Sequence, residues 1–226
     1  MPKEKTRRNL NAWDLTPKQA VLVQQELRSK TVTKDDFATI KTVAGVDVGF
    51  ENNGKTTRAA IVVLDLATLQ PIESQLIKTK TCFPYVPGLL SFRELPAILK
   101  AVEKLKVFPD LFLCDGQGIA HPRRMGIACH LGLCLDTPSI GVGKTRLIGR
   151  FDKVPEKKGE WVPLMDADEC IGAVLCTRDH VKPIFVSVGH RISLAKAIEF
   201  VMACVTRYKL PETTRYAHAL ASRKNS

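Results

Sequence analysis

Residues 43–66 read VAGVDVGFENNGKTTRAAIVVLDL, and this stretch decides the kind of fold. Two runs typical of β-strands, 43–51 and 56–66, flank the turn signal Asn52-Asn53-Gly54. The centre of the second run is apolar enough to be buried on both faces of a sheet. A weaker run follows at 72–81. Because the links are short, the three runs predict an antiparallel meander.

Helical and strand-like segments alternate through the rest of the chain. Thr16-Pro17 is typical of a helix start. Helices are predicted at 89–106, 125–135, 193–207 and 213–222, and buried strands at 110–115, 138–142, 171–176 and 184–188. The segment 152–168, with its prolines and glycine, is expected to be a surface excursion. The order predicts an α/β fold with a mixed sheet, three antiparallel strands followed by parallel strands, flanked by helices.

The polar and basic residues 1–14 are expected to form a flexible arm, and residues 15–226 a single domain. No signal peptide is recognisable, and no apolar run approaches the ~20 residues of a membrane span. The seven cysteines contain no C-x-x-C pair and are expected to be reduced. These features predict a cytoplasmic protein. Six of the cysteines are expected to act as small buried hydrophobic residues: Cys82, Cys114, Cys129, Cys134, Cys176 and Cys204.

The net charge of +11 favours a polyanionic partner, either nucleic acid or an anionic membrane surface. Basic residues outnumber acidic ones in residues 1–41, 120–160 and 203–226, whereas the two balance in residues 42–119. A nuclease needs this distribution, with acids to hold cations and bases to hold phosphates. The alternative is a basic, solvated surface without a partner.

Two aspartates are placed where a metal site could form. Asp47 lies inside an apolar strand, and Asp115 ends another. A carboxylate in such a place is costly unless it is paired, hydrogen-bonded or bound to a metal. Each aspartate alone could simply cap a turn, but together they favour a site for Mg²⁺, with Mn²⁺ as a substitute.

Glu94 has a competing structural explanation. Residues 91–94 read SFRE, which matches a capping box in which the glutamate bonds back to the helix start. Only its position on the helix between the two aspartate strands makes Glu94 a candidate third ligand.

Four further features are candidates for contacts with nucleic acid. Residues 115–124 read DGQGIAHPRR, which offers His121 and two arginines that could clamp phosphates. The segment 141–145, GVGKT, lacks the first glycine of a P-loop, so Lys144 is either a phosphate contact or a solvated lysine. Tyr85, between two prolines, is either a stacking surface for bases or an aromatic that packs on its own loop. His218 on the last helix is by itself more typical of a structural histidine.

Taken together, these residues resemble the endonuclease V family, the deoxyinosine 3′ endonucleases. The resemblance runs through nearly the whole chain from the first helix onward. It is carried by GVDVGFE (45–51), PYVPGLLSFRE (84–94), DGQGIAHPRRMGIA (115–128), GVGKTRL (141–147), GHRIS (189–193) and LPETTRYAHALAS (210–222). The chain departs from the common family pattern at Val86, where isoleucine is usual, and at Gln117, where histidine is usual. Neither change removes a candidate ligand.

The resemblance implies a ribonuclease H-like fold in which Asp47, Glu94 and Asp115 share the metal. It implies that Tyr85 fills the gap left by a turned-out base and that His121 lies near the metal and the cut phosphate. Lys144 would hold phosphate or orient the water, and His218 would complete the metal side. The hypoxanthine pocket would be formed by Gly88, Leu90, Gly116, Ile127 and Gly141.

The implied reaction is a nick at the second phosphodiester bond 3′ to hypoxanthine, leaving a 3′-hydroxyl and a 5′-phosphate. The implied partner is deoxyinosine-containing DNA, with inosine-containing RNA as the alternative, and a monomer is expected. Two other functions stay open, a junction resolvase of the same fold and a non-catalytic nucleic-acid binder. A zinc base deaminase is disfavoured because its H-x-E and P-C-x-x-C signature is absent.

Overall fold

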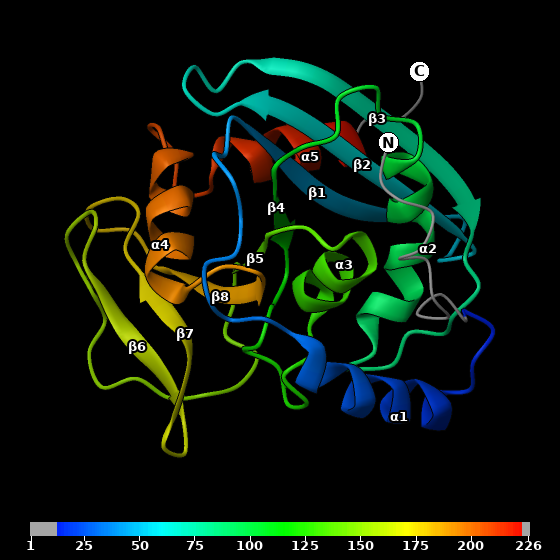
Figure 1. Cartoon of the computed structure of the whole chain (residues 1–226), viewed down its shortest axis with the longest axis horizontal. Helices are drawn as coiled ribbons and strands as arrows, with labels where there is room; N and C mark the ends of the chain where they lie inside the picture. Colours follow the sequence, from blue (N-terminus) through cyan, green and yellow to red (C-terminus); the bar gives the residue numbers. More distant parts are fainter. Residues whose placement is uncertain (1–12, 223–226) are drawn as a thin grey trace.

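The computed structural model describes residues 13–222, so nearly all of the predicted basic arm lies outside the described residues. A single mixed sheet runs through the molecule in the order β3-β2-β1-β4-β5-β8-β7-β6 (Figure 1). The predicted meander is confirmed, because β1 pairs antiparallel with β2 and β2 with β3. Parallel pairing joins β1 to β4 and β4 to β5. The strands are β1 (Thr42–Glu51), β2 (Thr56–Asp65), β3 (Pro71–Lys80), β4 (Leu111–Asp115), β5 (Ser139–Gly143), β6 (Trp161–Asp166), β7 (Glu169–Leu175) and β8 (Ile184–His190).

The predicted mixed α/β class is confirmed, but parallel pairing is confined to β1, β4 and β5. Strands β8, β7 and β6 pair antiparallel with their neighbours. The connections from β6 to β7 and from β7 to β8 are short, and short connections allow only antiparallel pairing. The expectation that 152–168 is a surface excursion is wrong for its second half, which forms the edge strand β6.

Helices cover both faces of the sheet. They are α1 (Pro17–Leu27), the short 3₁₀-helix η2 (Arg28–Lys30), α2 (Leu90–Val102), α3 (Ile127–Leu135), α4 (Leu194–Ala203) and α5 (Glu212–Ser222). Alternate residues of β1 point to opposite faces, so Val43 packs in the layer that includes α4, whereas Ala44 packs with α2 and α3. Helix α5 crosses β1 so closely that a Cβ at Gly45 would overlap the Thr213 carbonyl group. Among the described residues, no helix has the length and apolar character needed to cross a bilayer.

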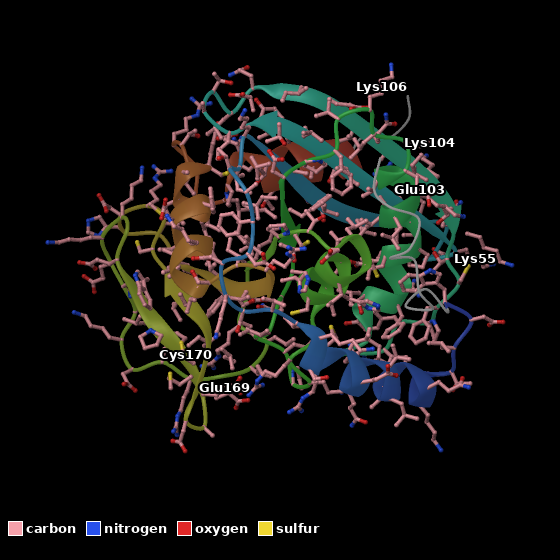
Figure 2. All side chains as sticks on the ribbon, in the orientation of Figure 1. Lys55, Glu103, Lys104, Lys106, Glu169 and Cys170 are labelled. Carbon is pink, nitrogen blue, oxygen red and sulfur yellow. The ribbon has the colours of Figure 1, made fainter. Side chains whose placement is uncertain are left out.

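The cysteine prediction is only partly right. All seven thiols are free, and Cys114, Cys129, Cys176 and Cys204 are buried. Cys82 is exposed because it lies in the loop that leaves β3, and Cys134 is half-buried near the end of α3. Cys170, on the hairpin of β6 and β7, is also exposed at the edge of the molecule (Figure 2).

Candidate active site

Asp47 and Asp115 lie side by side on neighbouring parallel strands. The last paired residues of β1 and β4 are Val46 and Cys114, so the two aspartates are the next residues of the same register. Neighbouring strands lie ~4.8 Å apart, so the two aspartates are close together at the carboxyl-terminal end of β4. Burial raises the pKa of Asp115, and the charge of Asp47 acts in the same direction, whereas Lys144 opposes the shift.

Glu94 reaches the same place from α2. Its side chain is buried, and burial together with the charges of Asp47 and Asp115 raises its pKa to about 8. The capping-box alternative is wrong, because α2 starts at Leu90 and its N-cap, Leu89, makes no side-chain hydrogen bond. The Ser91 hydroxyl instead bonds to the buried His130 ring at 3.0 Å. Glu94 is therefore a buried acid beside two other acids, without a capping role.

Two basic side chains engage the aspartates. Lys144, which follows β5, donates to Asp115 Oδ2 at 2.5 Å. His218 Nδ1 on α5 lies 2.8 Å from Asp47 Oδ2, and the other Asp47 oxygen accepts the Val48 amide at 2.8 Å. Four segments that are far apart in the sequence therefore meet near the carboxyl-terminal end of β4, those around Asp47, Asp115, Lys144 and His218.

This donor set suits a hard divalent cation. Three carboxylates share one partly buried region, and their mutual repulsion favours a cation that would neutralise them. Within residues 13–222, no group of three or more His, Cys, Asp or Glu side chains is close enough to hold an ion as placed. Lys144 and His218 each engage one oxygen of the aspartates. A cation bound by both aspartates would compete with Lys144 and His218 for these oxygens.

A second network surrounds the Gly88 carbonyl group. This oxygen accepts from His121 Nε2 at 3.0 Å, from Arg123 Nη2 at 2.7 Å and from Gln24 Nε2 at 3.0 Å. His121 Nδ1 in turn accepts the Arg123 amide at 3.2 Å, so both ring nitrogens are used. Burial lowers the pKa of His121 to about 4, and the Arg123 charge acts in the same direction. Tyr85, three residues before Gly88, is 72% exposed on the loop that this network holds.

The two arginines of DGQGIAHPRR are both committed within the protein. Besides Gly88, Arg123 bonds to Gln24 Oε1 at 2.5 Å. Arg124 forms ion pairs with Asp166 at 2.7 Å and Glu169 at 2.8 Å, both on the β6–β7 hairpin. The expectation that these arginines clamp phosphates is not supported, because their guanidinium groups already hold loops together. Gln24 was missed as a site residue, since nothing in α1 marks it.

The residues predicted for a base pocket are only partly grouped. A Cβ at Gly116 would overlap the Ile127 side chain, and a Cβ at Gly141 would overlap the backbone of 116–118. These three residues therefore pack against one another beneath the loop that follows β4. Gly88 joins the same loop through His121, and Leu90 begins α2.

Comparison with known proteins yields one family. The model of the endonuclease V family matches residues 25–219. The endonuclease V of Rippkaea orientalis is 55% identical over 208 residues, which cover 92% of this chain and 91% of that protein.

Solved structures agree with the sequence match. The endonuclease V of Streptomyces avermitilis has a TM-score of 0.88 at 40% identity and covers 93% of both chains. An endonuclease V of Ciona intestinalis, in complex with a 23mer DNA containing an inosine followed by a ribo-adenosine, has a TM-score of 0.81 at 30% identity, covering 92% of this chain and 97% of that one. At the level of fold alone, the Argonaute of A. aeolicus matches with a TM-score of 0.53 at 14% identity over 83% of this chain and 29% of that one, which accords with a ribonuclease H-like sheet.

Proposed function

Because the chain belongs to the endonuclease V family, we propose that its carboxylate site cuts the second phosphodiester bond 3′ to hypoxanthine, leaving a 3′-hydroxyl and a 5′-phosphate. The chain is a deoxyinosine 3′ endonuclease with a ribonuclease H-like fold, and its work is DNA repair. The proposed mechanism is supported by the proximity of Asp47, Glu94 and Asp115 near the carboxyl-terminal end of β4.

In the proposed mechanism these three carboxylates hold Mg²⁺, for which Mn²⁺ can substitute. When bound, such an ion would supply Lewis acidity for the hydrolysis of the phosphodiester. Glu94 must give up its proton to act as a ligand, and its raised pKa keeps that proton in place until a cation compensates the charge. Hard oxygen donors of this kind favour Mg²⁺ over zinc.

The neighbouring basic groups orient the acids and the substrate. Lys144, at 2.5 Å from Asp115, provides a positive charge beside the site where a phosphate would lie. His218 fixes the Asp47 carboxylate from α5. We assign His121 to positioning, because its ring stays neutral near pH 7 and both nitrogens are engaged within the protein.

Base recognition is assigned to the loops around the carboxylates. Tyr85 is exposed to solvent on a loop stiffened by two prolines. A side chain that inserts into the base stack in place of a turned-out base needs such a position. The hypoxanthine pocket is assigned to Gly88, Leu90, Gly116, Ile127 and Gly141. Turning out a base costs a few kcal/mol, least where the base is mispaired, which favours a lesion.

The remaining assignments are that residues 15–226 act as one domain, as a monomer, in the cytoplasm. Deoxyinosine-containing DNA is the proposed substrate, since the Ciona intestinalis structures contain inosine-bearing DNA. Inosine-containing RNA is the second candidate. The ribo-adenosine that follows the inosine in those complexes favours testing it.

The test compares strands that differ only at one base, inosine or adenine, as DNA and as RNA, with Mg²⁺ or with EDTA. We expect cutting only with inosine and Mg²⁺. Asp115→Ala should lower the rate by at least ~10²-fold, because several kcal/mol of charge stabilisation is lost. Asp152→Ala, on an exposed loop, is the matched control. Equal cutting by both variants would overturn the assignment.

A further inference from the structure

A groove opens beside the carboxylate site, on the far side of Lys144. Its volume is about 510 Å³, and it is formed by the segments that follow β5, precede β8 and precede α5. These segments belong to the β6–β7–β8 side of the sheet in Figure 1. Of the residues predicted for the active site, only Lys144 lines it.

The lining of the groove is strongly positive. Lys144, Arg146, Lys182 and Lys209 line it, against the single carboxylate of Glu156. Within residues 13–222, no ion pair involves Arg146, Lys182 or Lys209. Partial burial lowers the pKa of Lys209, and the charge of Lys182 adds to the shift. Two uncompensated ammonium groups close to each other are suited to a bound anion.

The lining of the groove also includes apolar residues and an aromatic ring. Phe151, Val154, Pro155 and Pro183 line it. The guanidinium group of Arg146 lies over the Phe151 ring, 5.6 Å from its centroid. Apolar and cationic residues in one groove match a nucleotide, whose base has flat aromatic faces and whose phosphate is charged.

The groove adjoins the carboxylate site through Lys144. Asp115 at the end of β4 pairs with Val142 on β5, and the next residue of β5, Gly143, pairs with Phe185 near the start of β8. Lys144 stands between the two regions and bonds to Asp115. Leu90 and Glu94 lie on α2, and none of the residues assigned to base recognition lines the groove. A strand whose inosine occupies the assigned base pocket and whose cut bond lies at the carboxylates can therefore continue past Lys144 into the groove.

We propose that this groove holds the substrate strand on the 3′ side of the cut, with its phosphates on Lys182 and Lys209 and a base against Phe151. The inference rests on the proposed function, since it needs a strand that is cut at Asp115. The groove would be a second binding region. It would make affinity rise with the length of the strand on the 3′ side of the cut, without preference for a particular base.

The experiment measures how binding depends on the length of the 3′ flank. Single-stranded DNA with one inosine and a fixed 5′ flank carries 3′ flanks that increase stepwise from about two to about twelve nucleotides. The flank probes the groove, whose site size is expected to fall in the ~4–16 nucleotide range of single-strand grooves. Binding is measured with Ca²⁺ in place of Mg²⁺, and cutting of the same strands with Mg²⁺ is measured in parallel.

For the parent protein, we expect affinity to rise with 3′ length and then to level off. In Lys182→Ala/Lys209→Met, which keeps the apolar stem at the half-buried position, this gain should fall by about tenfold. The salt dependence should also weaken, by ~0.7 in the log–log slope for each single-strand phosphate that the variant no longer neutralises. The single variant Lys182→Glu, at an exposed position, should show the same loss if the double variant is poorly folded.

Lys104→Ala/Lys106→Ala is the matched control, because both lysines are exposed and lie beyond the end of α2, remote from the groove (Figure 2). It should keep the full gain with 3′ length. An unchanged gain in the groove variants, or a loss that follows the 5′ flank instead, would overturn the inference. If the parent protein fails to cut inosine strands with Mg²⁺, the proposed function itself fails, and that result is separate from any effect of flank length.

Discussion

The ring of His121 lies against the carbonyl group of Gly88, with Nε2 3.0 Å from the oxygen. This bond ties the loop that follows Asp115 at the end of β4 to the loop that carries Tyr85. Gly88 adopts a φ of 78°, a left-handed conformation that favours glycine, so the carbonyl direction depends on that residue. The His121 ring is thus one of three donors that fix the Gly88 carbonyl group and hold the two loops together.

His121→Ala is expected to weaken binding of inosine DNA more than it slows cutting at saturation. The substitution leaves the Gly88 carbonyl group with two donors in place of three, so the Tyr85 loop should become less ordered. His121→Gln, which keeps a donor, should restore part of the affinity. Kd and single-turnover rate, measured for both variants, check this. A large loss of rate at unchanged Kd would indicate acid–base catalysis instead.

The pKa of His121 also predicts a pH dependence of stability. Folding lowers this pKa from 6.5 to about 4, so the unfolded chain binds the proton more readily. The contribution of a neutral His121 is present above about pH 6.5 and is lost as pH falls towards about 4. Thermal melts of the parent protein and His121→Gln across this window should converge at acid pH. Parallel curves would contradict a neutral, buried ring.

Tyr85→Ala is expected to lower the affinity for inosine duplex by the ~1–3 kcal/mol of one base–aromatic stack. Tyr85→Phe should bind almost as the parent does, because stacking needs the ring and not the hydroxyl. The loss should be larger for duplex than for single strands, since only a duplex has a stack to hold open. Binding of both variants to matched substrates decides this. Unchanged affinity of Tyr85→Ala for the duplex would mean that the ring only packs its own loop.

The carboxylate site could be predicted because its physical signal is local. An aspartate inside or at the end of an apolar strand is visible in the sequence, and parallel strands bring such residues together. The role of Glu94 could not be obtained in this way, because SFRE matches a capping box equally well. That choice depends on where α2 starts, and the helix starts one residue before Ser91.

Strand β6 and the two arginines show where local patterns fail. As an edge strand, β6 has only one buried residue and contains Pro163, so it lacks the alternation of a buried strand. Its place is set by pairing with β7. Arg124 is held by acids more than forty residues away, and no spacing rule in one sequence reveals such partners.

Binding to nucleic acid is expected to weaken steeply with salt. The chain has a net charge of +11, and its basic excess lies in residues 1–41, 120–160 and 203–226. Each phosphate neutralised adds ~0.9 to the log–log slope for duplex DNA. Kd measured between low and moderate salt checks this, with sodium chloride varied at constant Ca²⁺. A flat dependence would count against a footprint dominated by phosphate contacts.

Glu94→Gln is expected to make the protein more stable without Mg²⁺ while abolishing its activity. Folding raises the pKa of Glu94 to about 8 because of burial and the two aspartates, so the folded state disfavours the charged form. The stability contributed by the protonated form is present below about pH 4.5 and is lost as pH rises through about 8. Glutamine has no proton to lose, and its advantage at pH 8 should reach a few kcal/mol, of the order that ~1.4 kcal/mol per pKa unit allows.

The prediction is checked by thermal melts in EDTA at pH 5 and pH 8, with and without added Mg²⁺. The gain of Glu94→Gln over the parent should be large at pH 8 and small at pH 5, and Mg²⁺ should stabilise the parent more than the variant. Glu103→Gln, at an exposed glutamate at the end of the same helix (Figure 2), should keep the activity and should not reproduce the gain that appears only at pH 8. If Glu94→Gln melts below the parent at pH 8 in EDTA, the charged form of Glu94 does not destabilise the folded protein without a cation. The raised pKa would then no longer support a role for Glu94 as a metal ligand.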